Sequence, residues 1–427
     1  MRSPLLLSLT TFAVVLGVLA ILNRPSAPAQ PPAPAQPLAR DATTAERIDF
    51  LQSAARRAPG DADLLVSLGQ AYSQRARETG DSSLYPRAEA VLRRALELDR
   101  RSVAAVSTLG AIALARHDFV EALALGRRAR RMAPDSIGPF PVVVDALIEL
   151  GRYDDAREEL QRLLDRKPGL PAYARVSYYR ELHGDIDGAI EAMRLAVSAG
   201  GEPENVAYVT AILGNLEFAR GRTTAARRAY RAALRVSPDH PPALVGLART
   251  DAGSGRLERA VRRLQTVVNR LPLPEYVIAL GETALAAGHE ERARDQFALV
   301  RAQQRLLEGR GVDTDVELAL FEADHGDARR AVELARRAWS AAPSVRSADA
   351  MGWALTRAGR PARGHAWMRR ALARGWKDPL VLYHAGMSAA RAGRTEDARR
   401  HLRAALDLNP RFSPLYAPRA RQALEDL

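Results

Sequence analysis

Histidines are the side chains of this chain best suited to metal chemistry, because a neutral imidazole is a common metal ligand. Three of the eight, His365, His384 and His401, lie 19 and 17 residues apart. No pair has the i, i+4 spacing of a helical His-Glu-x-x-His site, so we predict no metal site. Four others fall in or beside predicted turns, where we expect them to be exposed to solvent: His117, His183, His289 and His325.

Nucleophilic and acid–base chemistry also lack a recognisable arrangement. The chain has no cysteine, which excludes thiol catalysis, disulfides and Cys-ligated metals. It contains no nucleophile elbow, phosphate-binding glycine loop or dinucleotide fingerprint. We therefore predict no catalytic residues and no cofactor, and expect a protein that is not an enzyme. Its adjacent carboxylates are typical of helix starts and surface charge, as in Asp154-Asp155, Glu158-Glu159 and Glu290-Glu291.

Arginine carries nearly all of the positive charge of this basic chain. The formal net charge is +13 over 427 residues, and Lys167 and Lys377 are the only lysines among 63 basic residues. These arginines are either ordinary solvated surface or a basic ridge for an anionic membrane, a cell-wall polymer or nucleic acid. Because aromatic residues for base stacking are not interleaved with them, nucleic acid is the least favoured partner.

The first forty residues predict a membrane address. Ser3 to Asn23 are 21 uncharged residues, which span about 31 Å as a helix and match a hydrocarbon core of roughly 30 Å. We predict a transmembrane signal-anchor over 1–24 and a Pro/Ala-rich linker over 25–41 that runs as polyproline II. The alternatives are a cleaved signal peptide and a segment that is neither. The predicted location is the cell membrane, single-pass, with the remaining chain extracytoplasmic, or secreted after cleavage.

The elements that position these side chains repeat about every 34 residues. Glycines recur at spacings of 33 to 38 residues, and alanine stands five residues after nearly all of them. Because glycine ends a helix and proline stops the next one, each unit predicts a pair of helices. The glycine series comprises Gly151, Gly184, Gly221, Gly255, Gly288, Gly326, Gly359 and Gly393.

One unit, residues 207–240, illustrates the expected helix pair. Gly221 separates a first helix from a second, whose Ala226 and Tyr230 fall on one face. Gly214 lies in the middle of the first helix, where it costs about 1 kcal/mol relative to alanine. We infer that glycine on one helix and alanine on the other allow the two helices to approach closely.

The pattern resembles the tetratricopeptide-repeat family, whose 34-residue helix–turn–helix units carry Leu-Gly, Ala, Ala and Pro at fixed offsets. The Leu-Gly pair is present at Leu68-Gly69 and Leu213-Gly214, for example. The resemblance covers residues 62–412 and implies an all-α, right-handed α-solenoid of about ten repeats. We expect residues 42–61 to form an N-terminal capping half-repeat and residues 413–427 a C-terminal capping helix. The expected unit starts are Ala62, Val103, Ile137, Leu170, Ala207, Pro241, Pro274, Val312, Val345 and Pro379.

In this family the concave face is lined by the first helices and binds peptides or protein segments. Chaperone-binding members carry a Lys/Asn/Arg clamp, which the corresponding positions here do not reproduce. Trp353, Tyr383 and Met387 either form an apolar anchor pocket in the groove or belong to the core between repeats. The resemblance implies a partner-binding groove at Gln70, Asp145, Tyr178, Asn215, Arg249, Glu282, Trp353, Tyr383 and Met387.

These features together predict a membrane-tethered, periplasmic scaffold or adaptor of bacterial type. It is expected to bind protein or peptide partners without catalysis and to have no small-molecule substrate. One alternative is a cytosol-facing basic adaptor associated with nucleic acid or anionic surfaces. Another is an accessory subunit of an envelope enzyme complex.

Overall fold

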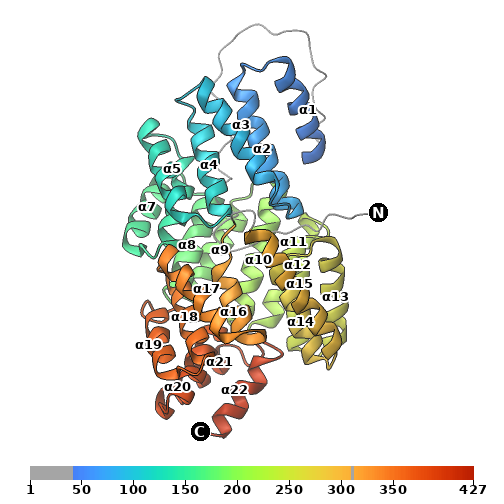
Figure 1. Ribbon diagram of the computed structural model, residues 1–427, viewed down its shortest axis with the longest axis vertical. Helices are drawn as coiled ribbons and strands as arrows, with labels where there is room; N and C mark the ends of the chain where they lie inside the picture. The colour runs from blue at the N-terminus through green and yellow to red at the C-terminus, as the bar shows by residue number, and fades with distance from the viewer. Residues whose placement is uncertain (1–41, 309–311) are drawn as a thin grey trace. The chain divides into compact units, whose positions relative to one another are not determined.

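A computed structural model describes residues 42–308 and 312–427 of the protein. Within these residues the chain forms 22 α-helices and no β-strand (Figure 1). Helices α2 to α21 form ten consecutive pairs, each with a first and a second helix joined by a short connection. The prediction of an all-α array of about ten helix pairs is confirmed.

The chain divides into two compact units, the first ending at Ala146 and the second running from Leu147 to Leu427. The division falls inside helix α6. The helices up to this point are α1 (Thr44–Arg57), α2 (Ala62–Thr79), α3 (Leu84–Leu98), α4 (Val103–Ala115), α5 (Phe119–Met132) and α6 (Pro139–Glu149).

The second unit contains the remaining pairs and one additional C-terminal helix. Its first six helices after α6 are α7 (Tyr153–Arg166), α8 (Leu170–Leu182), α9 (Ile186–Ser198), α10 (Pro203–Ala219), α11 (Thr223–Val236) and α12 (Pro241–Gly253). The next five are α13 (Leu257–Arg270), α14 (Pro274–Ala286), α15 (Glu290–Glu308), α16 (Asp315–His325) and α17 (Ala328–Ala341). The last five are α18 (Val345–Arg357), α19 (Pro361–Ala371), α20 (Pro379–Arg391), α21 (Thr395–Leu408) and α22 (Tyr416–Glu425).

A glycine in the first helix of a pair receives a large side chain from the second. A Cβ on Gly214, or on Gly246 of the next pair, would overlap the fully buried ring of Tyr230. The predicted close approach of the helices is confirmed, but the glycine makes room for Tyr230 rather than for Ala226, four residues earlier. The same relation joins Gly69 to Leu92, Gly281 to Phe297, Gly352 to Met368 and Gly386 to Leu402.

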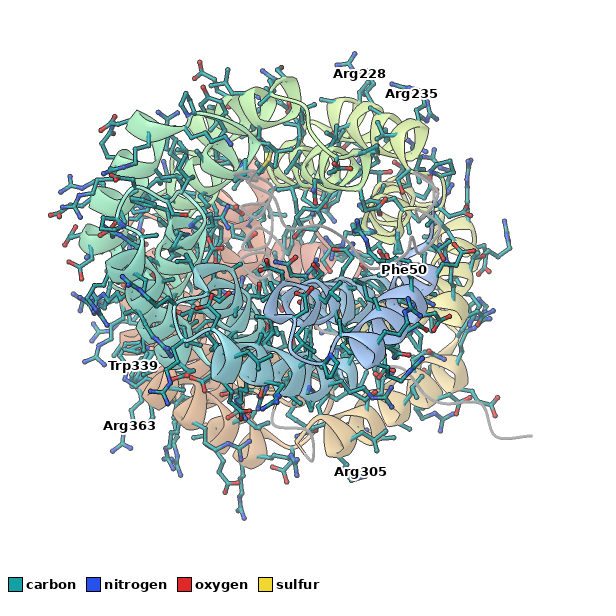
Figure 2. The ribbon with its side chains drawn as sticks, turned by 90° about the horizontal axis from the view of Figure 1, so that it is seen from above. Phe50, Arg228, Arg235, Arg305, Trp339 and Arg363 are labelled. Carbon is teal, nitrogen blue, oxygen red and sulfur yellow. The ribbon has the colours of Figure 1, made fainter. Side chains whose placement is uncertain are left out.

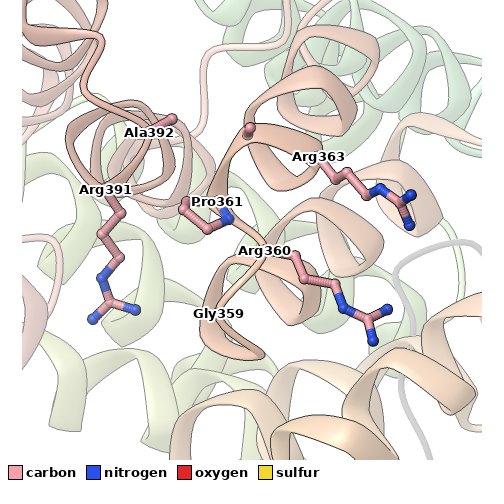
Figure 3. A pocket seen from close by; sticks show the side chains of 7 residues that line it. Gly359, Arg360, Pro361, Arg363, Arg391 and Ala392 are labelled. Carbon is pink, nitrogen blue, oxygen red and sulfur yellow. The ribbon is translucent and has the colours of Figure 1, made fainter.

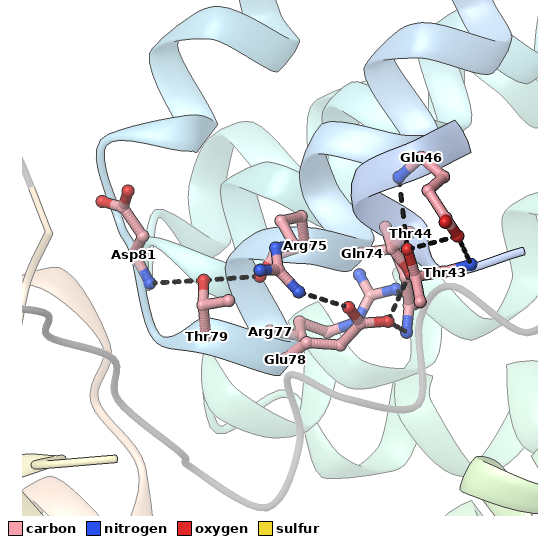
Figure 4. A network of polar contacts seen from close by, with 9 residues as sticks. All are labelled: Thr43, Thr44, Glu46, Gln74, Arg75, Arg77, Glu78, Thr79 and Asp81. Atoms are coloured by element: carbon pink, nitrogen blue, oxygen red, sulfur yellow. Dashed lines mark hydrogen bonds and ion pairs between the residues drawn. The ribbon is translucent and has the colours of Figure 1, made fainter. Parts of the chain in front are cut away.

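A capping box fixes the beginning of the first described helix, α1. Thr43 N donates to Glu46 Oε2 at 2.8 Å, and Glu46 N donates to Thr43 Oγ1 at 3.3 Å (Figure 4). Helix α2 has 18 residues and is longer than the other first helices. Near its end, Glu78 Oε1 accepts a hydrogen bond from Thr44 Oγ1 at 2.6 Å. The longer helix α2 is thereby tied to the start of α1.

The second unit winds back on itself, so that segments far apart in sequence touch (Figure 1). Asn409 Nδ2 donates to Phe218 O at 2.7 Å, and Val345 N donates to the hydroxyl of Tyr153 at 2.9 Å. The partners are 191 and 192 residues apart, which corresponds to roughly five to six repeats of about 34 residues. Loops that follow second helices therefore lie against the turn regions of earlier pairs.

No helix in the described part of the chain is long and apolar enough to cross a membrane. The two with 18 or more residues, α2 and α15, carry charged residues along their length. The predicted signal-anchor, 1–24, and the Pro/Ala-rich linker, 25–41, lie outside the described residues. The prediction of a single-pass membrane protein is corrected accordingly, because no described helix supports it.

Candidate partner-binding surfaces

The predicted groove residues differ widely in accessibility. In the second unit, Tyr178, Trp353 and Tyr383 are at most 3% exposed, because the packing of the chain covers them. Asn215, Glu282 and Met387 are half-buried there, and Arg249 is exposed. In the first unit, Gln70 is half-buried and Asp145 is buried. A role of these nine residues in partner binding stays a prediction.

Trp353 is enclosed by neighbours from three pairs of helices. Its indole N–H donates to Asp324 Oδ1 at 3.0 Å, and its ring stacks on His384 with centroids 4.5 Å apart. The ring of Tyr383 lies 5.9 Å away. The structure therefore places Trp353 and Tyr383 in the core between repeats. Their burial favours this alternative over the apolar anchor pocket, which stays a prediction.

The C-terminal helix α22 contributes a side chain to the same region. The hydroxyl of Tyr416 donates to Glu282 Oε1 at 3.1 Å, and its ring centroid is 5.3 Å from that of Tyr383. His325 Nε2 lies 3.0 Å from the same Glu282 oxygen. Tyr416 and Glu282 are 134 residues apart. Predicted groove residues of α14, α18 and α20 thus belong to one polar and aromatic cluster that α22 completes.

A second internal cluster surrounds Tyr178. Its hydroxyl donates to Glu149 Oε1 at 2.9 Å, and Arg346 Nη2 contacts Glu317 Oε1 at 3.2 Å. Burial disfavours the charge on Arg346, but electrostatic interaction with Tyr178, Glu149 and Glu317 outweighs burial and raises the pKa of Arg346. The charges of this cluster are directed at one another and join α16 and α18 to α6 and α8.

Two further acids lie where the loop after α19 meets the end of α8. Burial and the nearby Asp378 carboxylate raise the pKa of Glu181 to about 8, although Arg346 opposes the rise. Burial also raises the pKa of Asp378, whose Oδ1 caps α20 by accepting from Leu380 N at 2.8 Å. Folding therefore brings two carboxyl groups together that cannot both ionise freely at neutral pH.

His384 is buried beside three carboxyl groups. Burial lowers its pKa, but Asp349, Asp324 and Asp378 outweigh burial and raise it. Its Nδ1 lies 2.9 Å from Asp349 Oδ1. This histidine is consequently part of the charge balance of the core, between the Trp353 ring and the Asp349 carboxylate.

The prediction that the turn histidines are exposed is wrong for three of them. One is His183, which is half-buried and stacks on Tyr179 with ring centroids 4.1 Å apart. The other two are His117 and His325. His117 is 9% exposed, and the side chain of His325 is 7% exposed. Each packs on an aromatic ring, His117 on Phe119 and His325 on Phe297, with centroids 5.5 and 4.2 Å apart. His117 also takes the place of a turn glycine, with φ at +61°. His289 is exposed, as predicted, and contacts Glu258.

Among the described residues, no group of three or more His, Asp or Glu side chains is arranged to hold a metal ion. The histidine–carboxylate contacts described above are pairs within separate packing clusters, such as His384 with Asp349 and His325 with Glu282. The prediction of no metal site stays a prediction for the whole chain.

Among the hollows on the described surface of the second unit are two in which the charged side chains do not converge on a common point. In the first, of about 590 Å³, Arg391 points away from Arg360 and Arg363 (Figure 3). The second, of about 640 Å³, carries charges of both signs. The first is lined by Gly359, Arg360, Pro361, Ala362, Arg363, Arg391 and Ala392. The second is lined by Arg301, Gln304, Arg305, Glu322, Gly326, Asp327 and Arg330.

Sequence analysis missed a set of buried acids near the ends of first helices. Glu217, Asp251 and Glu322 are at most 3% exposed, and each lies four residues before a turn glycine. An arginine from the preceding second helix contacts each of them. The contacts are Arg194 with Glu217 at 2.6 Å, Arg227 with Asp251 at 2.8 Å and Arg301 with Glu322 at 3.6 Å. The shared offset from the glycine is the signal that could have identified them.

Family comparison agrees with this arrangement of helix pairs. Models described as tetratricopeptide repeat match residues 113–177 and 217–280, residues 73–137, and residues 380–411. No curated protein matches the chain. The fold is an α-solenoid of stacked helix pairs, and the chain belongs to the tetratricopeptide-repeat proteins.

Three solved structures are among those similar to this chain. The APC/C hetero-tetramer Cut9–Hcn1 has 16% identity and a TM-score of 0.40, over 90% of this chain and 84% of that chain. PilW, a type IV pilus biogenesis factor, has 19% identity and a TM-score of 0.40, over 47% and 92%. A monomeric mutant of IFIT1 with Gppp-AAAA has 15% identity and a TM-score of 0.41, over 84% and 76%.

Proposed function

We propose that the protein is a scaffold or adaptor that binds protein or peptide partners and performs no catalysis of its own. The observation that carries this proposal is the continuous series of tetratricopeptide-type helix pairs from α2 to α21. A right-handed array of such pairs presents extended surfaces made of many side chains. Extended surfaces of this kind suit recognition of a chain segment better than enclosure of a small molecule.

Rigidity of the second unit supports the proposal. The bonds from Asn409 to Phe218 and from Val345 to Tyr153 tie distant repeats of that unit together. A surface held in place before binding loses little conformational entropy when a partner arrives. Among the predicted groove residues of this unit, Arg249 is exposed and Met387 is half-buried, and we propose that both contact the partner.

The test is to identify proteins retained by the immobilised full chain and then measure the affinity of each purified candidate by calorimetry. We expect Arg249→Ala combined with Met387→Ala to weaken binding at least about tenfold, or about 1.4 kcal/mol. The matched control is Arg235→Ala, an exposed arginine of α11 that points away from the helices (Figure 2). It should leave the affinity unchanged.

Two results would contradict the proposal. If no purified protein binds the chain saturably, the scaffold function is wrong. If a partner binds but the double variant and the control have equal affinities, the proposed contact residues are wrong. Thermal unfolding of each variant, expected within a few degrees of the wild type, separates lost contacts from lost folding.

A further inference from the structure

Positive charge is concentrated in one segment of the second unit. Residues 218–270 contain twelve arginines and three acids, a net charge of +9 in a chain whose net charge is +13. This segment comprises α11, α12 and α13 with their connections. Arg228 and Arg235, on α11, point outward from the helices (Figure 2). The local excess of charge is far greater than the composition of the whole chain requires.

Four guanidinium groups of this segment converge on one buried carboxylate, that of Asp251, which is 0% exposed. Arg227 Nη2 donates to Asp251 Oδ1 at 2.8 Å, and Arg256 Nε donates to the same oxygen at 3.2 Å. Arg259 Nε lies 3.4 Å from Asp251 Oδ2, and Arg263 Nη2 lies 3.5 Å from it. The group of five side chains, which we name the Asp251 cluster, has a net charge of +3.

The Asp251 cluster has more hydrogen-bond donors than its carboxylate can use. Each guanidinium carries five N–H donors, and a carboxylate offers about four lone-pair sites. The Nε of Arg263 is buried without an acceptor, and Asp251 Oδ2 accepts no hydrogen bond and is reached only by the ion pairs with Arg259 and Arg263. The side chains of Arg256 and Arg259 are 43% and 53% exposed, so an anion from solvent can reach them. Positively charged N–H donors that lack an acceptor are therefore gathered beside the exposed side chains of Arg256 and Arg259.

Helix α13 adds to the positive potential at the same place. Arg256 is its N-cap residue, and Arg259 lies in its first turn. No side chain caps this turn, so its backbone N–H groups contribute the partial positive charge of a helix N-terminus. The other two acids of the segment are engaged elsewhere. Glu258 contacts His289 at 2.7 Å, and Asp239 contacts Arg270 at 3.5 Å.

We propose that the Asp251 cluster is a binding site for a phosphoryl dianion, held by Arg256 and Arg259 at the accessible edge and backed by Arg227 and Arg263. Guanidinium groups bind phosphoryl oxygens through paired, charge-assisted hydrogen bonds. A dianion reduces the excess charge of +3 to +1, which a single carboxylate does not. Asp251 itself orients the guanidiniums and competes with the ligand for their donors.

Two sources can supply this chemistry, free phosphate and a phosphorylated side chain of another protein. Nucleic-acid bases have no exposed aromatic ring to stack on in this segment, because Phe218 and Tyr230 are buried. The proposal uses none of the predicted groove residues and does not depend on their role.

The test measures binding of sodium phosphate to the full chain by calorimetry at constant ionic strength. A phosphoserine peptide and its unphosphorylated form are titrated in parallel. We expect saturable phosphate binding that weakens at least about tenfold in the double variant Arg256→Gln with Arg259→Gln. The control, Arg228→Gln with Arg235→Gln, removes the same charge from exposed positions of α11 and should change the affinity less than about twofold.

The variant Asp251→Asn should change phosphate affinity in the opposite direction to the arginine variants. Removing the competing carboxylate should tighten phosphate binding several-fold, provided that thermal unfolding shows a folded chain. If this variant does not fold, the two arginine pairs, which are exposed, still decide the question. A phosphopeptide that binds at least about tenfold more tightly than free phosphate identifies a protein as the source, and equal affinities identify the free ion.

The proposal is overturned if neither phosphate nor the phosphopeptide binds saturably. It is also overturned if both arginine pairs weaken binding equally, since the segment then acts only through its total charge. The two double variants can also be compared in binding to random duplex DNA. If both lose DNA affinity equally and phosphate does not bind saturably, the segment is a diffuse surface for polyanions instead. None of these outcomes affects the proposed partner-binding function, which is tested with other variants.

Discussion

Most turn glycines of the second unit share a left-handed backbone conformation, and these form two groups that differ in the atoms around them. Gly184 and Gly221 have φ angles of +77° and +78°. A Cβ on either would overlap a backbone carbonyl of a distant loop, that of Gly375 or Leu408. Gly255 has φ of +76°, yet no atom lies within 4 Å of its Cβ position. The repeated turn glycine therefore has two physical causes, the left-handed turn at all of these positions and close contact with a distant loop at some of them.

This difference separates contacts between neighbouring repeats from contacts between distant ones. The left-handed turn conformation is a local requirement of most pairs, and Gly326, with φ of −144°, is an exception. Close backbone contact is imposed only where the second unit winds back, as at Gly184 and Gly221. The two groups of glycines make it possible to weaken the long-range contact and the local turn separately.

Gly184→Ala is expected to have the largest effect. The left-handed conformation costs a non-glycine residue about 1–2 kcal/mol, and overlap with the Gly375 carbonyl adds about 1–3 kcal/mol. The free energy of unfolding should fall by roughly 2–5 kcal/mol in urea denaturation. Gly255→Ala, the control, should lose only the turn term of about 1–2 kcal/mol. Equal losses would mean that the contact between distant loops does not form.

Asn409→Ala removes a polar part of the same long-range contact. Asn409 is 1% exposed and donates to Phe218 O at 2.7 Å, and its Oδ1 accepts from Arg411 N at 2.9 Å. Phe218 O then keeps the bond from Gly221 N at 2.9 Å, so the loss of the Asn409 bond should reduce the free energy of unfolding by about 1 kcal/mol. The control is Asn269→Ala at an exposed position, expected within about 0.5 kcal/mol of wild type. A neutral Asn409→Ala variant would argue against the winding of the second unit.

Helix pairing could be predicted from the sequence because its causes are local. The first helices begin at the predicted residue in seven of ten repeats, among them Ala62, Leu170 and Val345. Two of the three differences, at Pro139 and Pro203, have a local reason. At α10 the helix begins at Pro203 rather than Ala207, since proline suits the first position of a helix. The other two first helices begin at Pro139 and Asp315 instead of Ile137 and Val312.

Contacts between distant repeats could not be predicted in the same way. The position of Tyr416 against Glu282 depends on small angles between successive pairs that accumulate over 134 residues. The burial of Trp353, which favours core over groove, depends on this accumulated geometry as well. The Asp251 cluster has a partial signal in sequence, the excess of arginine over residues 218–270. Its convergence on a single carboxylate is a property of packing.

Glu181→Gln tests the electrostatics of the loop contact at Gly184. Burial and Asp378 raise the pKa of Glu181 to about 8 in the folded chain, against about 4.3 in an unfolded one. The folded state therefore binds this proton more tightly, and stability present in acid is lost as the pH rises from about 4.3 through 8. Glutamine stays neutral, so the decrease in Tm between about pH 5.5 and 8.5 should be smaller in the variant. An unchanged decrease would show that Glu181 does not titrate in this contact.

The smallest effect is expected for Gly255→Asn. Asparagine adopts the left-handed region more readily than other side chains, and the space around the Gly255 Cβ position is open. The free energy of unfolding should change by less than about 1 kcal/mol. Gly184→Asn has the same backbone preference but meets the Gly375 carbonyl, so it should lose nearly as much as Gly184→Ala. If asparagine were equally tolerated at both positions, turn conformation alone would explain the glycine repeat, and the second unit would have no close contact at Gly184.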